Sequence, residues 1–144
     1  MTQRNMKKKE NVFEMSCGSD TRQIACVEEF LKKINSKLHI KEDILYRLMV
    51  SCTEAVNNAI IHGNKSDDQK RVLIQCIAKK DTLTIRVKDQ GKGFDPNKLR
   101  NPTLSENLLK ENGRGVFLMQ SLMDKVSFKR LKSGSVVEMK VKIR

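Results

Sequence analysis

The sequence predicts an α/β (α+β) two-layer sandwich in which helices lie on one face of a mixed, mainly antiparallel sheet. Three observations predict this fold class. The expected elements follow the order strand, helix, helix, two strands, long loop, helix, two strands. Two pairs of consecutive strands are separated only by short turns, as in hairpins. A length of 144 residues with 38% hydrophobic residues suits one compact domain.

The first two expected elements are a strand at residues 11–17 and a helix after it. Apolar residues alternate with polar neighbours in NVFEMSC, which is the pattern of a strand. Ser19, Asp20 and Thr21 then offer side chains that cap helices. The apolar residues that follow have the spacing of one helical face: Ile24, Val27, Leu31, Ile34 and Leu38.

A longer apolar stripe predicts a second helix, which begins after Lys41 and ends at Gly63. Glycine is a natural helix stop because it readily adopts the conformation that ends a helix. The stripe is nearly unbroken and consists of Ile44, Leu45, Leu48, Met49, Cys52, Ala55, Val56, Ala59 and Ile60.

Two hairpins are expected in the remaining chain. Residues 71–79 are apolar on both faces in places, residues 81–89 alternate, and the turn between them lies near Lys80 and Asp81. The closing hairpin pairs residues 125–131 with residues 135–143. Its turn is expected at Ser133 and Gly134.

The apolar periodicity stops between these hairpins, from Gly91 to Gly113. Both prolines lie in this segment, and only residues 106–110 have the pattern of a short helix. Loops of this length inside compact domains are usually functional or disordered. A third helix is then indicated by the spacing of Val116, Leu118, Met119, Leu122 and Met123.

Charge and hydropathy limit the classes of function. The net charge of +12 favours a polyanionic ligand, which can be a nucleotide, a nucleic acid or an acidic protein face. We expect residues 1–10 to be a flexible basic N-terminus and residues 11–144 to form the domain. No apolar run of about 18 residues and no apolar stretch behind the basic N-terminus is present, so we expect a cytoplasmic protein without a membrane span.

The cysteines predict neither disulfides nor a zinc site. They are scattered, form no C-x-x-C pair and lie within apolar patterns: Cys17, Cys26, Cys52 and Cys76. We therefore expect reduced, buried thiols.

Polar residues interrupt the second helix near its end, in SCTEAVNNAIIHGN. At about 100° per residue, Glu54, Asn58 and His62 follow one line, displaced from the apolar stripe. The carboxylate can accept a proton or orient a nucleophile, and the amide oxygen of Asn58 is a hard ligand suited to magnesium. The alternative for these residues alone is a solvated polar face. We expect His62 to form a hydrogen bond at the helix end rather than to act as a catalyst.

Two glycine-containing segments follow. In VKDQGKGFDP, Asp89 closes a strand and begins a D-x-G-x-G pattern with Gly91 and Gly93. A flat ligand can approach such a backbone closely, and the carboxylate can accept a hydrogen bond from an amino group such as that of adenine. In ENGRGVFLMQ, Gly113 and Gly115 precede a helix whose free N–H groups suit phosphate oxygens. Each segment alone is also compatible with an ordinary turn or helix entry.

The three segments in this order resemble the GHKL superfamily of ATP-binding domains, which share the Bergerat fold and a long lid over ATP. More closely, TEAVNNAIIHGN, DQGKGFDP and GRGVFLMQSLMD resemble the RsbW/SpoIIAB-like anti-sigma factor serine/threonine kinases. The resemblance extends from about Phe13 to Ile143 and implies that residues 96–112 form the lid.

The resemblance implies a role for each motif residue. Glu54 would be the general base of catalysis, and Asn58 would bind Mg²⁺. Asp89 would read adenine, with Gly91 and Gly93 beside the base.

The same resemblance assigns further nucleotide contacts. Gly113, Arg114 and Gly115 would meet the phosphates of ATP. Ser135 would take the place of a threonine that supports adenine through water, and it keeps the hydroxyl group. His62 is grouped with these nucleotide-binding residues.

The resemblance also implies an activity and partners. Such proteins transfer the γ-phosphoryl group of ATP to a STAS-domain anti-anti-sigma protein, sequester a sigma factor and form homodimers, and Arg22 would lie at the partner surface. One alternative is a nucleotide-binding anti-sigma adaptor without significant kinase activity. A nucleic-acid-binding protein is another, although the sequence has no helix-turn-helix, zinc or RRM signature. We expect no direct contact with nucleic acid or membrane. A histidine autokinase is disfavoured because neither His39 nor His62 precedes the domain in a helical hairpin.

Overall fold

The computed structural model of the protein describes residues 10–91 and 114–144. Most of the expected basic N-terminus therefore lies outside the described residues. The same is true of nearly the whole expected long loop, its short helix at residues 106–110 and the expected lid.

The first half of the described chain has the predicted strand and two helices. β1 (Glu10–Gly18) is followed by a 3₁₀ turn, η1 (Thr21–Gln23), and by α2 (Ile24–Leu38). Asp20 caps this turn, because its side chain accepts a hydrogen bond from the Arg22 N–H. The second predicted helix is α3 (Glu42–Asn58), which continues into a π-helical turn, η2 (Ala59–Gly63). It ends at Gly63, as predicted.

Both predicted hairpins are present. β2 (Arg71–Lys79) and β3 (Thr82–Asp89) form the first hairpin, and β4 (Lys125–Leu131) and β5 (Gly134–Lys142) form the second. The first turn lies at Lys80, whose φ of 55° is positive. The predicted third helix occupies residues 114–122 and lies between the hairpins in sequence.

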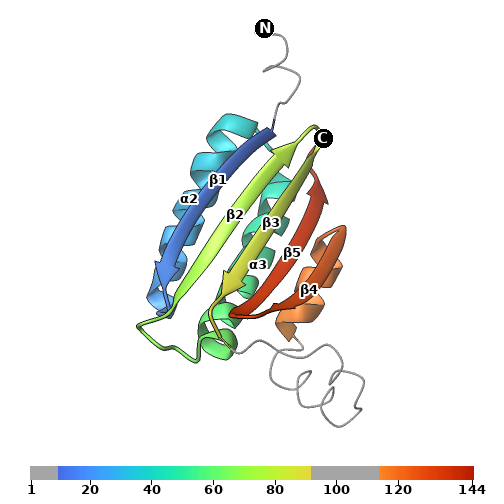
Figure 1. Ribbon diagram of the computed structural model, residues 1–144. Coiled ribbons are helices and arrows are strands. Elements are labelled where there is room, and N and C mark those ends of the chain that lie inside the picture. Colours follow the sequence, from blue (N-terminus) through green and yellow to red (C-terminus); the bar gives the residue numbers. More distant parts are fainter. Residues whose placement is uncertain (1–9, 92–113) are drawn as a thin grey trace, which may run out of the picture.

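The strands form one five-stranded sheet in the order β1-β2-β3-β5-β4, and its four pairings are antiparallel. Figure 1 shows α2, α3 and the helix at residues 114–122 together on one face of this sheet. The predicted two-layer sandwich with a mainly antiparallel sheet is confirmed. None of the helices in the described ranges has the length and apolar character that a membrane crossing needs.

The hydrophobic core lies between the sheet and the helices. The predicted face of α2 is buried, at Val27, Leu31, Ile34 and Leu38. Every second residue of the two central strands is also buried, including Ile74 and Cys76 on β2 and Ile85 and Val87 on β3. Because side chains alternate along a strand, this register places the next residue of the series, Asp89, on the helix side of the sheet.

Burial is confirmed for three of the four cysteines. Cys17, Cys52 and Cys76 are free and buried, and burial raises the pKa of the Cys52 thiol to about 12. Burial also raises the pKa of Cys17 and of Cys76. Cys26 is free but exposed, so the expectation of burial was wrong for this residue. It immediately precedes Val27 and therefore lies beside the buried stripe of α2 rather than within it.

Candidate active site

The Asp89 carboxylate lies at the end of β3, opposite Ser135 on β5. It is buried, with 6% of the residue exposed. Its Oδ1 accepts hydrogen bonds from the backbone N–H groups of Gly91 at 2.9 Å and Ser135 at 3.3 Å. Its Oδ2 accepts a hydrogen bond from Ser135 Oγ at 2.8 Å. The ends of two strands thus fix the orientation of the carboxylate.

The hydrogen bonds that this carboxylate forms with the described residues leave acceptor capacity for a ligand. The two oxygens of a carboxylate offer about four lone-pair positions between them. The three hydrogen bonds occupy both positions on Oδ1 and one on Oδ2. The second position on Oδ2 can accept a hydrogen bond from an amino group, as the predicted adenine-reading role requires.

Two glycines allow the backbone to close around Asp89. A Cβ atom at Gly63 would overlap the Asp89 carboxylate, and a Cβ atom at Gly91 would overlap the Gly63 carbonyl. Only glycine permits such close approach. The end of η2, the end of β3 and the start of β5 therefore meet at one carboxylate. The sequence pattern indicated Gly91 as a residue of the ligand site, whereas it indicated Gly63 only as the end of a helix.

Glu54 and Asn58 lie one turn apart on α3 and face the first turn of the helix at residues 114–122. A Cβ atom at Gly115 would lie 2.8 Å from Glu54 Oε2 and 3.4 Å from Asn58 Nδ2. The absence of a side chain at Gly115 therefore lets this helix end approach both polar groups. The N–H groups in the first turn of a helix carry positive partial charge. A carboxylate, a carboxamide and an anion-attracting helix end converge here.

The helix that carries Glu54 and Asn58 changes its winding directly after them. In η2 the Asn64 N–H bonds to the Ala59 carbonyl at 2.8 Å, a π-helical spacing. Such turns occur frequently at functional sites. Because each residue of a π turn advances by a smaller angle than in an α-helix, His62 is displaced from the line of Glu54 and Asn58 that a regular helix predicted. His62 is half-buried in this turn, and its expected hydrogen bond stays a prediction.

Comparison with known proteins identifies the group to which this arrangement belongs. The family described as histidine kinase-like ATPase domain matches residues 17–141. The chain belongs to this family. Serine-protein kinase RsbW of Bacillus licheniformis is 30% identical to it over 140 residues, covering 93% of this chain and 87% of that protein. The anti-sigma F factor of Anoxybacillus flavithermus is 32% identical over 100 residues, covering 67% and 68%.

Solved structures show the same fold of the histidine kinase-like ATPase domain. The RsbU and RsbW domains of a Mycobacterium tuberculosis protein superpose with a TM-score of 0.68 at 12% identity, covering 92% of this chain and 32% of that one. The mycobacterial sensor histidine kinase MprB gives a TM-score of 0.55 at 11% identity, covering 92% and 99%. The Bergerat-type fold that the motifs predicted is therefore confirmed.

The predicted magnesium ligand of this histidine kinase-like ATPase domain fits its role chemically. Magnesium in nucleotide sites keeps several waters and takes one or two protein oxygens in addition to phosphate oxygens. The Asn58 carboxamide, half-buried beside Gly115, can supply one such oxygen. No group of three or more His, Cys, Asp or Glu residues that could hold a metal ion occurs in the described ranges.

The remaining predicted phosphate contacts of the ATPase domain are only partly described. Arg114 is the first described residue of the helix at residues 114–122 and is exposed, whereas Gly115 is buried. Gly113 lies outside the described residues, and so does Gly93, which was predicted to lie beside the base.

Asn64 is a buried residue next to the candidate site that the sequence patterns did not indicate. It is fully buried, with 0% exposed, and directly follows Gly63. Its Oδ1 accepts a hydrogen bond from the Gln90 N–H at 2.7 Å. Its Nδ2 donates to Ser19 Oγ at 2.9 Å and to the Arg71 carbonyl at 3.1 Å. The amide thus joins the ends of β1, η2 and β3 to the start of β2, next to Asp89. The only sequence feature that could have indicated this role is the position of Asn64 immediately after the glycine that was predicted to end the helix.

Asn64→Ala is expected to lower the free energy of unfolding of the ATPase domain by about 2–3 kcal/mol. The substitution removes the buried hydrogen bond to Ser19 Oγ and the part-buried hydrogen bonds to the Gln90 N–H and the Arg71 carbonyl. Urea unfolding followed by circular dichroism measures this change. Asn57→Ala, at a half-buried position on α3, is the control, with an expected loss below about 1 kcal/mol. Equal losses in the two variants would show that the Asn64 hydrogen bonds contribute nothing special.

Arg22, the predicted partner contact of the ATPase domain, is held in place on the surface. Its Nε and Nη2 donate to Asp20 Oδ2 at 2.9 Å and 2.6 Å, and 88% of the Arg22 side chain is exposed. Asp20 also accepts from the Arg22 backbone N–H at 2.9 Å. This double use of Asp20 orients the guanidinium outward, where another protein can reach it.

The hydrogen bonds from Arg22 lower the pKa of Asp20 to about 2, with the side-chain bond as the main cause. Because the folded pKa lies below that of the unfolded chain, the contribution to stability is present above the usual carboxyl range and is lost as pH falls through about 2. Arg22→Ala should raise the Asp20 pKa towards its usual range. An NMR titration of the Asp20 side-chain carbon measures both values, and an unchanged pKa in the variant would contradict the assigned cause.

Proposed function

We propose that this chain is an ATP-dependent serine/threonine protein kinase and anti-sigma factor. It phosphorylates a STAS-domain anti-anti-sigma protein and sequesters a sigma factor. The observation that supports this most directly is the convergence of Glu54 and Asn58 on Gly115, at the end of a helix suited to phosphate. The names of its relatives, serine-protein kinase RsbW and anti-sigma F factor, support the two halves of the proposal.

Asp89 binds the adenine base in this proposal. The exocyclic amino group donates to the free position on Oδ2, while the Ser135 hydroxyl and the Gly91 N–H hold the carboxylate in orientation. Gly63 and Gly91 leave the backbone bare, so a flat ring can lie against it. These contacts select adenine over a base that presents a carbonyl at the same position.

Glu54 acts as the general base of phosphoryl transfer. It accepts the proton of the substrate serine or threonine hydroxyl as that oxygen bonds to the γ-phosphorus of ATP. The bond from the γ-phosphorus to its bridging oxygen breaks, and ADP leaves with that oxygen. Asn58 holds Mg²⁺, which neutralises phosphate charge when bound. Arg114 and the N–H groups of its helix stabilise the transferred group. Most of the catalysis is positioning and electrostatics.

The partners are other proteins. The exposed Arg22, fixed by Asp20, contacts the partner in this proposal. Phosphorylation of the STAS-domain protein releases the kinase, which then holds the sigma factor again. The kinase acts in the cytoplasm as a homodimer, without direct contact with nucleic acid or membrane.

Incubation with γ-labelled ATP, Mg²⁺ and a STAS-domain protein encoded near this gene tests the proposal. The expected result is label on a serine or threonine of the STAS protein, together with ATP-dependent capture of a sigma factor. Capture of sigma without transfer of label would instead identify an ATP-binding anti-sigma adaptor. Binding of neither protein would contradict the proposed function.

A further inference from the structure

The sheet face opposite the helices is uncovered in the described part of the chain, and it is hollowed near its centre. In Figure 1 all the drawn helices lie behind the sheet, and no described element crosses its other face. A shallow hollow of about 410 Å³ lies across β2, β3, β5 and β4 on this face. None of the nucleotide-site residues described above lines it. The hollow is therefore separate from the candidate active site.

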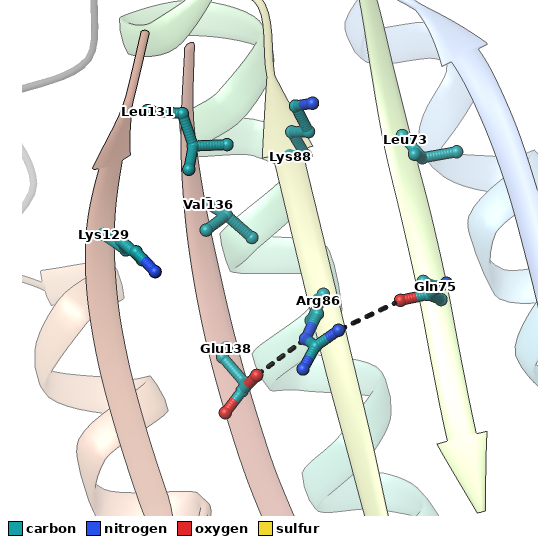
Figure 2. Close-up of a pocket in the computed structure, with 8 residues that line it drawn as sticks. All are labelled: Leu73, Gln75, Arg86, Lys88, Lys129, Leu131, Val136 and Glu138. Atoms are coloured by element: carbon teal, nitrogen blue, oxygen red, sulfur yellow. Dashed lines mark hydrogen bonds and ion pairs between the residues drawn. The ribbon is translucent and has the colours of Figure 1, made fainter.

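The floor of the hollow is aliphatic. Val136 on β5 and Leu131 on β4 are half-buried, and Leu73 on β2 is 40% exposed. Lys88 on β3 lies between Leu73 and Val136 in the strand register. Figure 2 shows the three aliphatic side chains spread across these strands. A sheet face that only met water would normally carry polar side chains at such positions. The floor can accept one apolar side chain of a ligand.

The rim of the hollow has cations in excess. Arg86 Nε bonds to Glu138 Oε2 at 2.6 Å, so the single carboxylate of the hollow is already neutralised. Figure 2 shows Arg86 between Glu138 and Gln75, with Lys88 and Lys129 apart from the Glu138 carboxylate. Within the described ranges neither of these two lysines forms an ion pair. The strand register places these two positive charges on either side of Val136, in the row Leu73, Lys88, Val136, Lys129.

The positive charge of the chain is concentrated on this side of the described fold. Besides the cations of the hollow, the register places Arg71, Lys79, Lys125, Lys140 and Lys142 on the same face, and its acidic residues outside the hollow are Glu10 and Glu14. The three helices on the opposite face, α2, α3 and the helix at residues 114–122, carry equal numbers of carboxylates and cations. Because the asymmetry separates two faces of one small domain, it produces a directed field that attracts an anionic partner to the sheet.

We propose that this face is a docking surface for an acidic segment of a partner protein. One apolar side chain of that segment enters the hollow over Val136 and Leu131, and carboxylates on either side of it pair with Lys88 and Lys129, which flank Val136. Charge complementarity of this kind raises the association rate and gives specificity. The proposal goes beyond the kinase function, and it concerns a face that does not include Asp89 or Glu54.

A protein segment fits these features better than the two other occupants. A second copy of this chain, docked face to face, would bring like charges together across the interface. A nucleic acid would leave the aliphatic floor without a partner, and the hollow has no aromatic side chain on which a base can stack.

The test uses the full chain and a peptide with a neutral dye, in which glutamates flank a central leucine. Fluorescence anisotropy should show saturable binding that ATP does not displace. Lys88→Gln with Lys129→Gln should raise the Kd about tenfold or more, a loss of about 1.4 kcal/mol or more. Lys32→Gln with Lys33→Gln removes the same charge from α2 and should change the Kd less than about threefold. Replacing the central leucine of the peptide by serine should also weaken binding.

Several results would overturn the proposal. Equal losses in the two double variants would indicate unspecific charge attraction, and absence of saturable binding would leave no docking surface. Tighter binding of a duplex DNA probe, lost in the Lys88 and Lys129 variant, would identify a nucleic-acid surface. Loss of self-association in that variant, seen by sedimentation, would identify a dimer interface. An unchanged Kd for ATP in the variant shows that its active site is intact, so failure here is distinct from failure of the proposed kinase function.

Discussion

Glu54→Gln is expected to lower the rate of phosphoryl transfer by about 10²–10⁴-fold, the usual contribution of a positioned general base. Glutamine has the same size as glutamate, so it fits beside Gly115, where Oε2 already lies close to the helix end. It cannot take a proton from the attacking hydroxyl. The variant should therefore fold and bind its partners normally while transfer nearly stops.

The binding of ATP should respond differently to the same substitution. The contacts assigned to adenine belong to Asp89 and its neighbours on β3 and β5, whereas Glu54 lies on α3. Removal of a negative charge near the phosphates also removes a repulsion. We expect a Kd for ATP that is unchanged or slightly lower, measured by calorimetry. A single-turnover assay with labelled ATP and the STAS protein then measures transfer.

Glu28→Gln is the matched control for Glu54→Gln. It removes the same charge from an exposed position on α2, and its rate should stay within about twofold of the wild type. If Glu54→Gln also keeps the wild-type rate, Glu54 is not the general base, and its place at Gly115 is structural.

The fold could be predicted from the sequence because its signals are local. The stripe of α2 has a strict helical spacing, and the two hairpins have alternating strands joined by short turns, so periodicity identifies each element. The order of the strands in the sheet was not predicted. β5 lies between β3 and β4 in the sheet. This position depends on which apolar faces pack together in three dimensions, and a local sequence pattern does not predict such packing.

The site was predicted only in part for a related reason. Glu54, Asn58 and Asp89 carry polar groups that are unusual within an apolar helix or at the end of a strand. The order of the three motifs then indicated a nucleotide-binding role for these residues. Asn64 acts through partners on β1, β2 and β3, so its role depends on contacts between distant segments. The π turn was missed because the apolar stripe continues through Ala59 and Ile60, and a regular helix explains that stripe equally well.

Asp89→Asn is expected to weaken ATP binding by about 10–100-fold, the range for loss of a hydrogen bond to a charged group. Oδ1 of the native residue accepts from two backbone N–H groups, so the oxygen of asparagine should keep that place. The new NH₂ group then takes the position of Oδ2. It would face the adenine amino group. Two hydrogen-bond donors would then oppose each other, whereas in the native protein the amino group donates to the carboxylate oxygen.

This geometry predicts a change of base preference as well as a loss of affinity. Inosine triphosphate presents a carbonyl oxygen where ATP presents its amino group, so it should bind the asparagine variant better than it binds the wild type. Calorimetric titrations of both proteins with both nucleotides give the ratio of the two Kd values, which global destabilisation does not alter. Asp81→Asn, a neutralisation at an exposed turn, should leave this ratio unchanged. If Asp89→Asn also leaves it unchanged, the carboxylate does not contact the base, because a donor and an acceptor at the same point cannot prefer the same partner.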